Sequence, residues 1–210
     1  MTPIHENQSV LHSGAPLETA NAVMILLHGR GDSSQGIMGL SQEFEQSDFA
    51  FIAPQAANNT WYPFRFIEPT SRNEPYLTSA IQTVSNILEL TQKHVSLERT
   101  FLVGFSQGAC LALEVAARHG GKFGGVIAFS GGLIGDTLEA EKYKNMAQTP
   151  IFLGCSDVDS HIPKTRVEES AALLEQLGAS VTMRLYPNFG HTINADELEQ
   201  ARALIKTSLG

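Results

Sequence analysis

Short apolar runs alternate with helical patterns along this chain, and this alternation constrains its fold more than any other feature. The run at 181–186 alternates apolar and polar residues, which predicts a strand near the edge of a sheet. The other runs are apolar almost throughout, as expected for parallel strands buried on both faces. Strands that alternate with helices predict a mostly parallel sheet of six to seven strands with helices on both faces. The six predicted strands are residues 22–28, 49–53, 100–105, 125–129, 151–155 and 181–186.

Capping signals set the expected limits of several helices. The two glycines at 120–121 should end the helix that follows the third run, because a left-handed residue costs little there. Thr165 and Glu168 resemble a capping box at the start of a later helix. Asn194 and Glu197 form a second such pair before the last apolar stripe. The chain between 55 and 72 is a long irregular segment, and such loops inside a compact domain are usually functional.

The composition fits one soluble domain over residues 1–210. Hydrophobic residues make up 42% and charged residues 17%, so the chain can bury a core. The formal net charge of −8 argues against nucleic acid and against docking on anionic membranes. Cys110 and Cys155 lie in apolar runs and are expected to be reduced. With no apolar signal core near the N-terminus, we expect a cytoplasmic protein without a stable membrane anchor.

The strongest local motif is Gly104-Phe105-Ser106-Gln107-Gly108, between a predicted strand and a predicted helix. This is the G-x-S-x-G nucleophile elbow in its required strand–turn–helix context. The flanking glycines remove the Cβ atoms that would clash in a tight turn. The motif predicts Ser106 as the nucleophile of a hydrolase.

A serine hydroxyl needs a base, and in this arrangement the base comes last in the chain. The chain has seven histidines, but only His191 follows the last predicted strand. His191 is therefore the expected base. The acid should follow the fifth apolar run, where Asp157 and Asp159 are both candidates. An acid in this position orients the imidazole.

The oxyanion hole should combine two backbone N–H groups. One belongs to Gln107, the residue after the serine. The other comes from the loop after the first strand, where Arg30 is the expected donor through its main chain. We expect the neighbouring His28 to brace this loop rather than to act as a second base.

These residues together resemble the phospholipase/carboxylesterase family, which includes the acyl-protein thioesterases. The resemblance covers nearly the whole chain. Its motifs are Leu27-His28-Gly29-x-Gly31-Asp32, Gly104-Phe105-Ser106-Gln107-Gly108-Ala109, Asp159-x-x-Ile162-Pro163 and Gly190-His191. It implies a small α/β-hydrolase fold without a large cap domain.

The family pattern at the acid is Gly-x-x-Asp-x-x-Val-Pro, and this chain departs from it. In the family pattern the acid lies three residues after the glycine and four before the proline. Here Asp159 has the expected spacing to Pro163, whereas Asp157 has the expected spacing to Gly154. We favour Asp159, because Pro163 and the aliphatic Ile162 anchor that end of the loop.

The resemblance implies a carboxylic ester hydrolase that works through an acyl-enzyme on small or acyl-chain esters, as a carboxylesterase, lysophospholipase or thioesterase. The alternatives are a dienelactone-hydrolase-like or peptidase-like enzyme of the same fold, or a non-catalytic binding domain. Two segments are expected to wall the acyl site: the long loop with Trp61, Tyr62, Phe64 and Phe66, and residues 130–134 after the fourth strand. Trp61 and Leu133 are expected to contact substrate, although loop aromatics equally often extend a core. No cofactor or metal is expected, and the protein should be a monomer or homodimer.

Overall fold

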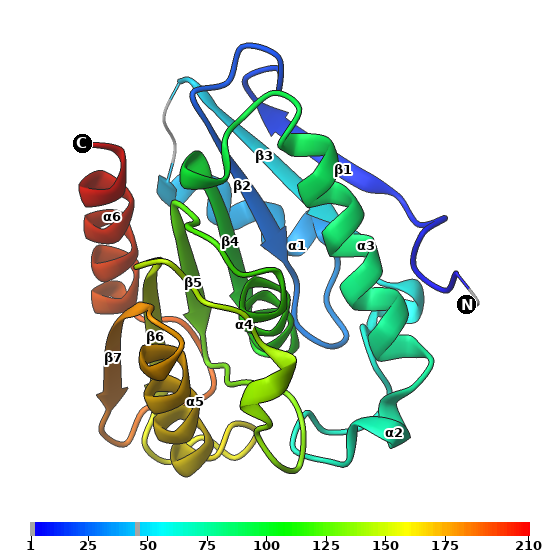
Figure 1. Cartoon of the computed structure of the whole chain (residues 1–210), viewed down its shortest axis with the longest axis vertical. Helices are drawn as coiled ribbons and strands as arrows, with labels where there is room; N and C mark the ends of the chain where they lie inside the picture. Colours follow the sequence, from blue (N-terminus) through cyan, green and yellow to red (C-terminus); the bar gives the residue numbers. More distant parts are fainter. Residues whose placement is uncertain (1–2, 45–46) are drawn as a thin grey trace.

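The computed structural model describes residues 3–44 and 47–210, and its centre is one seven-stranded sheet (Figure 1). The strand order is β1-β3-β2-β4-β5-β6-β7. Only β1 runs antiparallel to its neighbour, and all other neighbouring strands are parallel. The strands are β1 (Val10–Gly14), β2 (Ala22–Leu27), β3 (Phe49–Pro54), β4 (Thr100–Phe105), β5 (Gly125–Phe129), β6 (Pro150–Ser156) and β7 (Ser180–Tyr186).

All six predicted runs form strands, and the alternating one, β7, lies at an edge of the sheet as predicted. The strand β1 was not predicted. Its side chains are mostly exposed, so it carries no apolar run, and it is held by pairing with β3. Backbone hydrogen bonds rather than burial define this strand.

Helices cover both faces of the sheet, as predicted (Figure 1). Alternate residues of a buried strand belong to different cores: Met24 and Leu26 pack in one, Ile25 and Leu27 in the other. The second core also contains residues of α3, α4 and α5, whereas the first contains residues of α1 and α6. The helices are α1 (Ser34–Met38), α2 (Thr70–Asn73), α3 (Tyr76–Thr91), α4 (Gln107–His119), α5 (Lys164–Gln176) and α6 (Ala195–Leu209). Short 3₁₀ helices are η1 (Gly39–Phe44), η2 (Ala57–Asn59), η3 (Leu97–Arg99) and η4 (Ala140–Lys142).

Two of the three predicted helix ends are confirmed. Gly120 ends α4 with a φ of 70°, and the Asn194–Glu197 capping box opens α6. The predicted capping box at Thr165 is wrong. The helix α5 already begins at Lys164, and Pro163 in the capping position offers no side-chain acceptor. Thr165 therefore lies inside the first turn.

This is the α/β-hydrolase fold: a mostly parallel sheet with helices on both faces and, in the described residues, no cap domain. In such sheets ligands bind at the carboxyl ends of the strands. The loops that follow β2, β4, β6 and β7 all leave from that edge.

Candidate active site

Ser106 occupies a strained turn between β4 and α4. Its backbone angles are φ 54° and ψ −117°, which non-glycine residues rarely adopt. A Cβ on Gly104 would lie 2.4 Å from the backbone of Gly108, and one on Gly108 would lie 2.0 Å from the carbonyl oxygen of Leu27. The turn therefore requires glycine on both sides of the serine, as the motif predicted.

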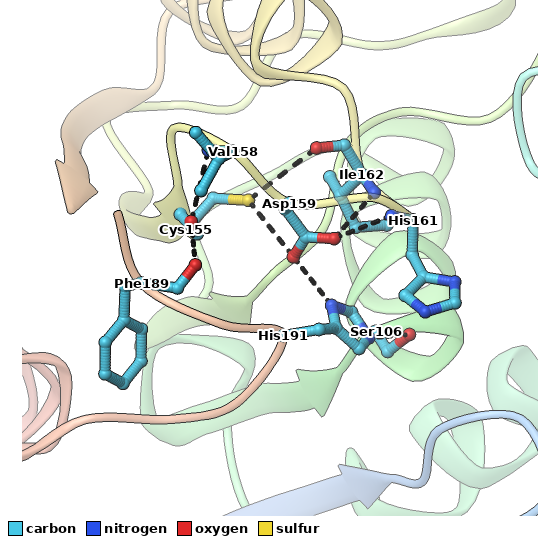
Figure 2. Close-up of polar contacts among 9 residues, drawn as sticks. Ser106, Cys155, Val158, Asp159, His161, Ile162, Phe189 and His191 are labelled. Carbon is cyan, nitrogen blue, oxygen red and sulfur yellow. Dashed lines mark hydrogen bonds and ion pairs between the residues drawn. The ribbon is translucent and has the colours of Figure 1, made fainter. Parts of the chain in front are cut away.

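The structure brings Ser106, His191 and Asp159 into one hydrogen-bonded chain (Figure 2). His191 lies in the loop between β7 and α6. Its Nε2 is 2.8 Å from Ser106 Oγ, and its Nδ1 is 2.6 Å from Asp159 Oδ2. With Nδ1–H donating to the carboxylate, Nε2 is free to accept the serine proton.

Asp159 is held at both oxygens. Its Oδ1 accepts the backbone N–H groups of His161 at 2.8 Å and Ile162 at 3.0 Å, while Oδ2 faces His191 (Figure 2). Burial of the carboxylate acts to raise its pKa, but the hydrogen bonds from His191 and the two backbone groups outweigh this and lower the pKa of Asp159. The group is therefore kept ionised beside the imidazole.

Asp157 has a different partner. Its Oδ1 accepts the backbone N–H of Asn188 at 2.8 Å. The adjacent Ser156 hydroxyl donates to the carbonyl of Phe189. Asp157 thus ties the loop after β6 to the loop that carries His191, without touching the imidazole itself.

The two expected oxyanion donors are Arg30, in the loop after β2, and Gln107, the first residue of α4 and the neighbour of the serine. In the described part of the chain, the backbone N–H groups of Arg30 and Gln107 donate to no protein acceptor. Gly29 packs close to Ser106, because a Cβ there would lie 3.6 Å from the serine Cβ. Both N–H groups are therefore available near Ser106.

Side chains of these residues also organise the long loop at 55–69, the part of the predicted irregular segment 55–72 that precedes α2. The Arg30 guanidinium donates to the carbonyls of Pro63 at 2.8 Å and Phe64 at 2.7 Å. The Gln107 amide accepts from the Trp61 N–H at 2.9 Å and donates to the Tyr62 carbonyl at 2.8 Å. The elbow and the loop after β2 therefore fix the loop at 55–69 against the serine.

Two buried histidines support the same loop. His28 Nδ1 donates to the Gly29 carbonyl at 2.8 Å and so braces its own loop after β2, as predicted, while its Nε2 accepts the Ala56 N–H of the long loop at 3.0 Å. His5 was not singled out from the sequence, yet it is 1% exposed. Its Nδ1 accepts the Ala57 N–H and its Nε2 donates to the Trp61 carbonyl, both at 3.0 Å. Burial lowers the pKa of both histidines, which therefore remain neutral bridges.

A cavity of about 610 Å³ opens above the serine. Its apolar lining comes from the long loop, the elbow and the loop after β6, and Cys110 of α4 also reaches it. The charged lining consists of Arg30, Asp32, Arg65 and Glu68. The apolar lining includes Tyr62, Phe64, Phe66, Phe105 and Ile162.

The structure does not place Trp61 and Leu133 in this cavity, contrary to the prediction of substrate contact. Both side chains are 0% exposed and pack in the core. The Trp61 indole N–H donates to the His28 carbonyl at 3.0 Å, which turns the ring away from the cavity. Aromatic character alone could not show which loop residues face inward. Tyr62, Phe64 and Phe66, the other aromatic residues of the predicted wall, line the cavity.

Comparison with known proteins agrees with this architecture. The family model described as Phospholipase/Carboxylesterase matches residues 14–209. The chain belongs to the phospholipase/carboxylesterase family. A crystal structure of a phospholipase/carboxylesterase from Dyadobacter fermentans is 38% identical with a TM-score of 0.93, covering 96% of this chain and 97% of that one.

Relatives of this phospholipase/carboxylesterase family member carry several names. Acyl-protein thioesterase 1 of Saccharomyces cerevisiae is 28% identical over 95% of this chain and 98% of its own length. Lysophospholipase-like protein 1 of Mus musculus is 26% identical over 93% and 90%. Among the described residues no helix is long and apolar enough to cross a membrane, and no group of three or more side chains could hold a metal ion.

Proposed function

We propose that this family member is a serine carboxylic ester hydrolase that works through an acyl-enzyme. The observation that carries the proposal is the hydrogen-bonded chain of Ser106, His191 and Asp159 at the floor of an open cavity. A nucleophile, a base within hydrogen-bond reach and a group that orients the base make up the machinery of acyl transfer. Family membership supports the same reaction class.

In the first step, Ser106 Oγ attacks the ester carbonyl while His191 Nε2 takes the hydroxyl proton. The carbonyl π electrons move to the oxygen, and the tetrahedral oxyanion is stabilised by the N–H groups of Arg30 and Gln107. When the intermediate collapses, the imidazolium returns the proton to the leaving alcohol or thiol. Water then repeats the sequence on the acyl-enzyme and releases the acid.

Asp159 does not take the proton in this scheme. It holds Nδ1–H and stabilises the imidazolium that forms during each half-reaction. Since hydrogen bonds from His191 and from two backbone N–H groups lower the pKa of this carboxylate, the negative charge is in place before the substrate arrives. Asp157 serves instead as the tether between the two loops.

The lining of the cavity favours a substrate whose acyl group, the part nearest the serine, is apolar. Its aromatic and aliphatic lining offers area for burial of an acyl chain. The relatives named as thioesterase and lysophospholipase-like protein support oxygen and sulfur leaving groups as members of the substrate class.

Hydrolysis of p-nitrophenyl acetate by the Ser106→Ala variant tests the proposal. We expect kcat/KM to fall on the order of 10³-fold or more with an unchanged melting temperature, because only binding and oxyanion stabilisation remain. Ser96→Ala, at an exposed serine outside the cavity lining, is the matched control and should retain wild-type activity. A folded Ser106→Ala protein with a near wild-type rate would refute the assignment.

A further inference from the structure

A buried thiol lies behind the proposed acid. Cys155 is the last residue but one of β6 and is only 1% exposed. Its Sγ lies 3.8 Å from Asp159 Oδ2, within reach of a hydrogen bond from sulfur, and 4.0 Å from the carbonyl oxygen of Ile162. Figure 2 shows the sulfur between these two acceptors. The scheme above gives this side chain no role.

The thiol of Cys155 is a protonated donor. It forms no disulfide, and burial together with the negative charge of Asp159 raises its pKa to about 12. The sulfur therefore keeps its proton around neutral pH. An S–H group is a weak donor, but a charged acceptor strengthens its hydrogen bond. Of the two acceptors, the carboxylate is both the nearer and the charged one, so it is the favoured partner.

The thiol completes the set of donors around the carboxylate. An ionised carboxylate offers about four acceptor sites. The backbone N–H groups of His161 and Ile162 face Asp159 Oδ1, and His191 Nδ1 faces Oδ2. Cys155 supplies a second donor to Oδ2. Because the Asp159 side chain is 0% exposed, no bulk water can replace a donor that is lost.

The loop between the thiol and the acid is the segment that departs from the family pattern. Asp159 lies five positions after Gly154, two more than in the pattern. A longer loop leaves more freedom to the side chain that it carries, so contacts must hold that side chain in place. Ile162 holds the far end of this loop. Cys155 lies on a buried strand and can hold the carboxylate from the near end.

We propose that Cys155 is a positioning residue that acts through Asp159: its S–H donates to Oδ2 and keeps this oxygen turned toward His191 Nδ1. This rests on the proposed function. Among the described residues, those that line the cavity do not include Cys155, so the thiol acts on the acid rather than on the substrate. Loss of the S–H should therefore lower kcat and leave KM unchanged.

The kinetic experiment compares hydrolysis of p-nitrophenyl acetate by the wild type, Cys155→Val and Cys155→Ala. Valine fills the space of the thiol without a donor, whereas alanine also leaves a void. Since one S–H hydrogen bond is lost, kcat should fall about two- to fivefold in both variants, with KM within about twofold. Val126→Ala, a void near the opposite end of the neighbouring strand β5, is the control and should lower only the melting temperature. A valine variant with wild-type kcat would mean that the thiol only packs, which would overturn the proposal.

Infrared spectroscopy of the S–H stretch gives a readout that does not depend on turnover. The chain has one other thiol, Cys110, whose band is the internal reference. The band of Cys155, absent in Cys155→Val, should lie at higher frequency in Asp159→Asn than in the wild type, because the carboxylate is the stronger acceptor. Donation to the Ile162 carbonyl would leave this band in place and overturn the proposal. A wild type that hydrolyses no ester would refute the proposed function, while the infrared comparison would still judge the contact.

Discussion

The elbow at 104–108 and the long loop at 55–69 line the same cavity but are held in different ways. The elbow is shaped by steric exclusion among neighbouring residues, since added Cβ atoms would lie 2.0 to 2.4 Å from backbone atoms. The loop is shaped by polar contacts to distant residues, including His5, Arg30 and Gln107. Steric exclusion between neighbouring residues can be predicted from a five-residue motif. Hydrogen bonds between residues far apart in the chain cannot be predicted from any short motif.

The largest expected effect separates two aspartates of the loop after β6. Asp159→Asn should lower kcat by up to ~10⁴-fold, because the imidazole loses its orienting charge and its tautomer. Asp157→Asn should keep kcat near the wild-type value and lose about 0.5–2 kcal/mol of unfolding free energy at most, because the amide oxygen can still accept the Asn188 N–H but without the carboxylate charge. Steady-state kinetics beside thermal melts decide the matter. If Asp157→Asn were inactive but normally stable and Asp159→Asn remained active, the triad acid would be Asp157 and the loop tether Asp159.

Gly108→Ala tests the steric side of the comparison. The new methyl group would meet the Leu27 carbonyl at 2.0 Å, so the backbone of the elbow must shift. We expect a loss of roughly 1–3 kcal/mol in unfolding free energy from overpacking, together with reduced kcat. Chemical denaturation and ester kinetics measure both. The matched change Gly39→Ala, where a Cβ would contact nothing within 4 Å, should be mild. Equal losses of unfolding free energy and kcat in the two variants would argue against steric exclusion as the reason for glycine at the elbow.

His5→Phe tests the distant contacts of the long loop. The phenylalanine can keep packing near Trp61, but the Ala57 N–H and the Trp61 carbonyl lose their partner. Each buried unpaired group costs ~1–3 kcal/mol, so with two groups unpaired the unfolding free energy should fall by roughly 2–6 kcal/mol. Because the loop lines the cavity, KM should rise more than kcat falls. A variant with wild-type stability and KM would mean that His5 does not hold the loop.

The last expected effect is on the pH dependence of stability and concerns Glu197, which caps α6 just after the His191 loop. Its side chain is buried, Oε1 has no partner among the described residues, and burial raises its pKa to about 7. A carboxyl whose pKa is raised by folding stabilises the protein most below its unfolded value, ~4.3, and this contribution is lost as pH rises to about 7. Glu197→Gln should remove that part of the pH dependence. Unfolding titrations at pH 5 and pH 8 measure it, and an unchanged pH difference would contradict the raised pKa.

The sequence predicted those elements of the fold whose own residues show a recognisable hydrophobic pattern or motif. Six strands were foreseen because burial on both faces demands an apolar run, while β1 was missed because its side chains are exposed. The sequence also selected Ser106, His191 and Asp159, which the structure brings together. Trp61 was predicted to face the cavity, but a residue type does not reveal the direction of a side chain. The role of His5 was invisible because its partners lie more than fifty positions away.

Labelling with a fluorophosphonate probe, with the modified residue mapped by mass spectrometry, tests the central claim most directly. An activated serine in an elbow should attack the phosphorus, displace fluoride and leave one stable adduct. The account predicts a single adduct on Ser106, no adduct in Ser106→Ala, and strongly slowed labelling in His191→Ala. No labelling of the folded wild type, or an adduct that persists in Ser106→Ala, would contradict it.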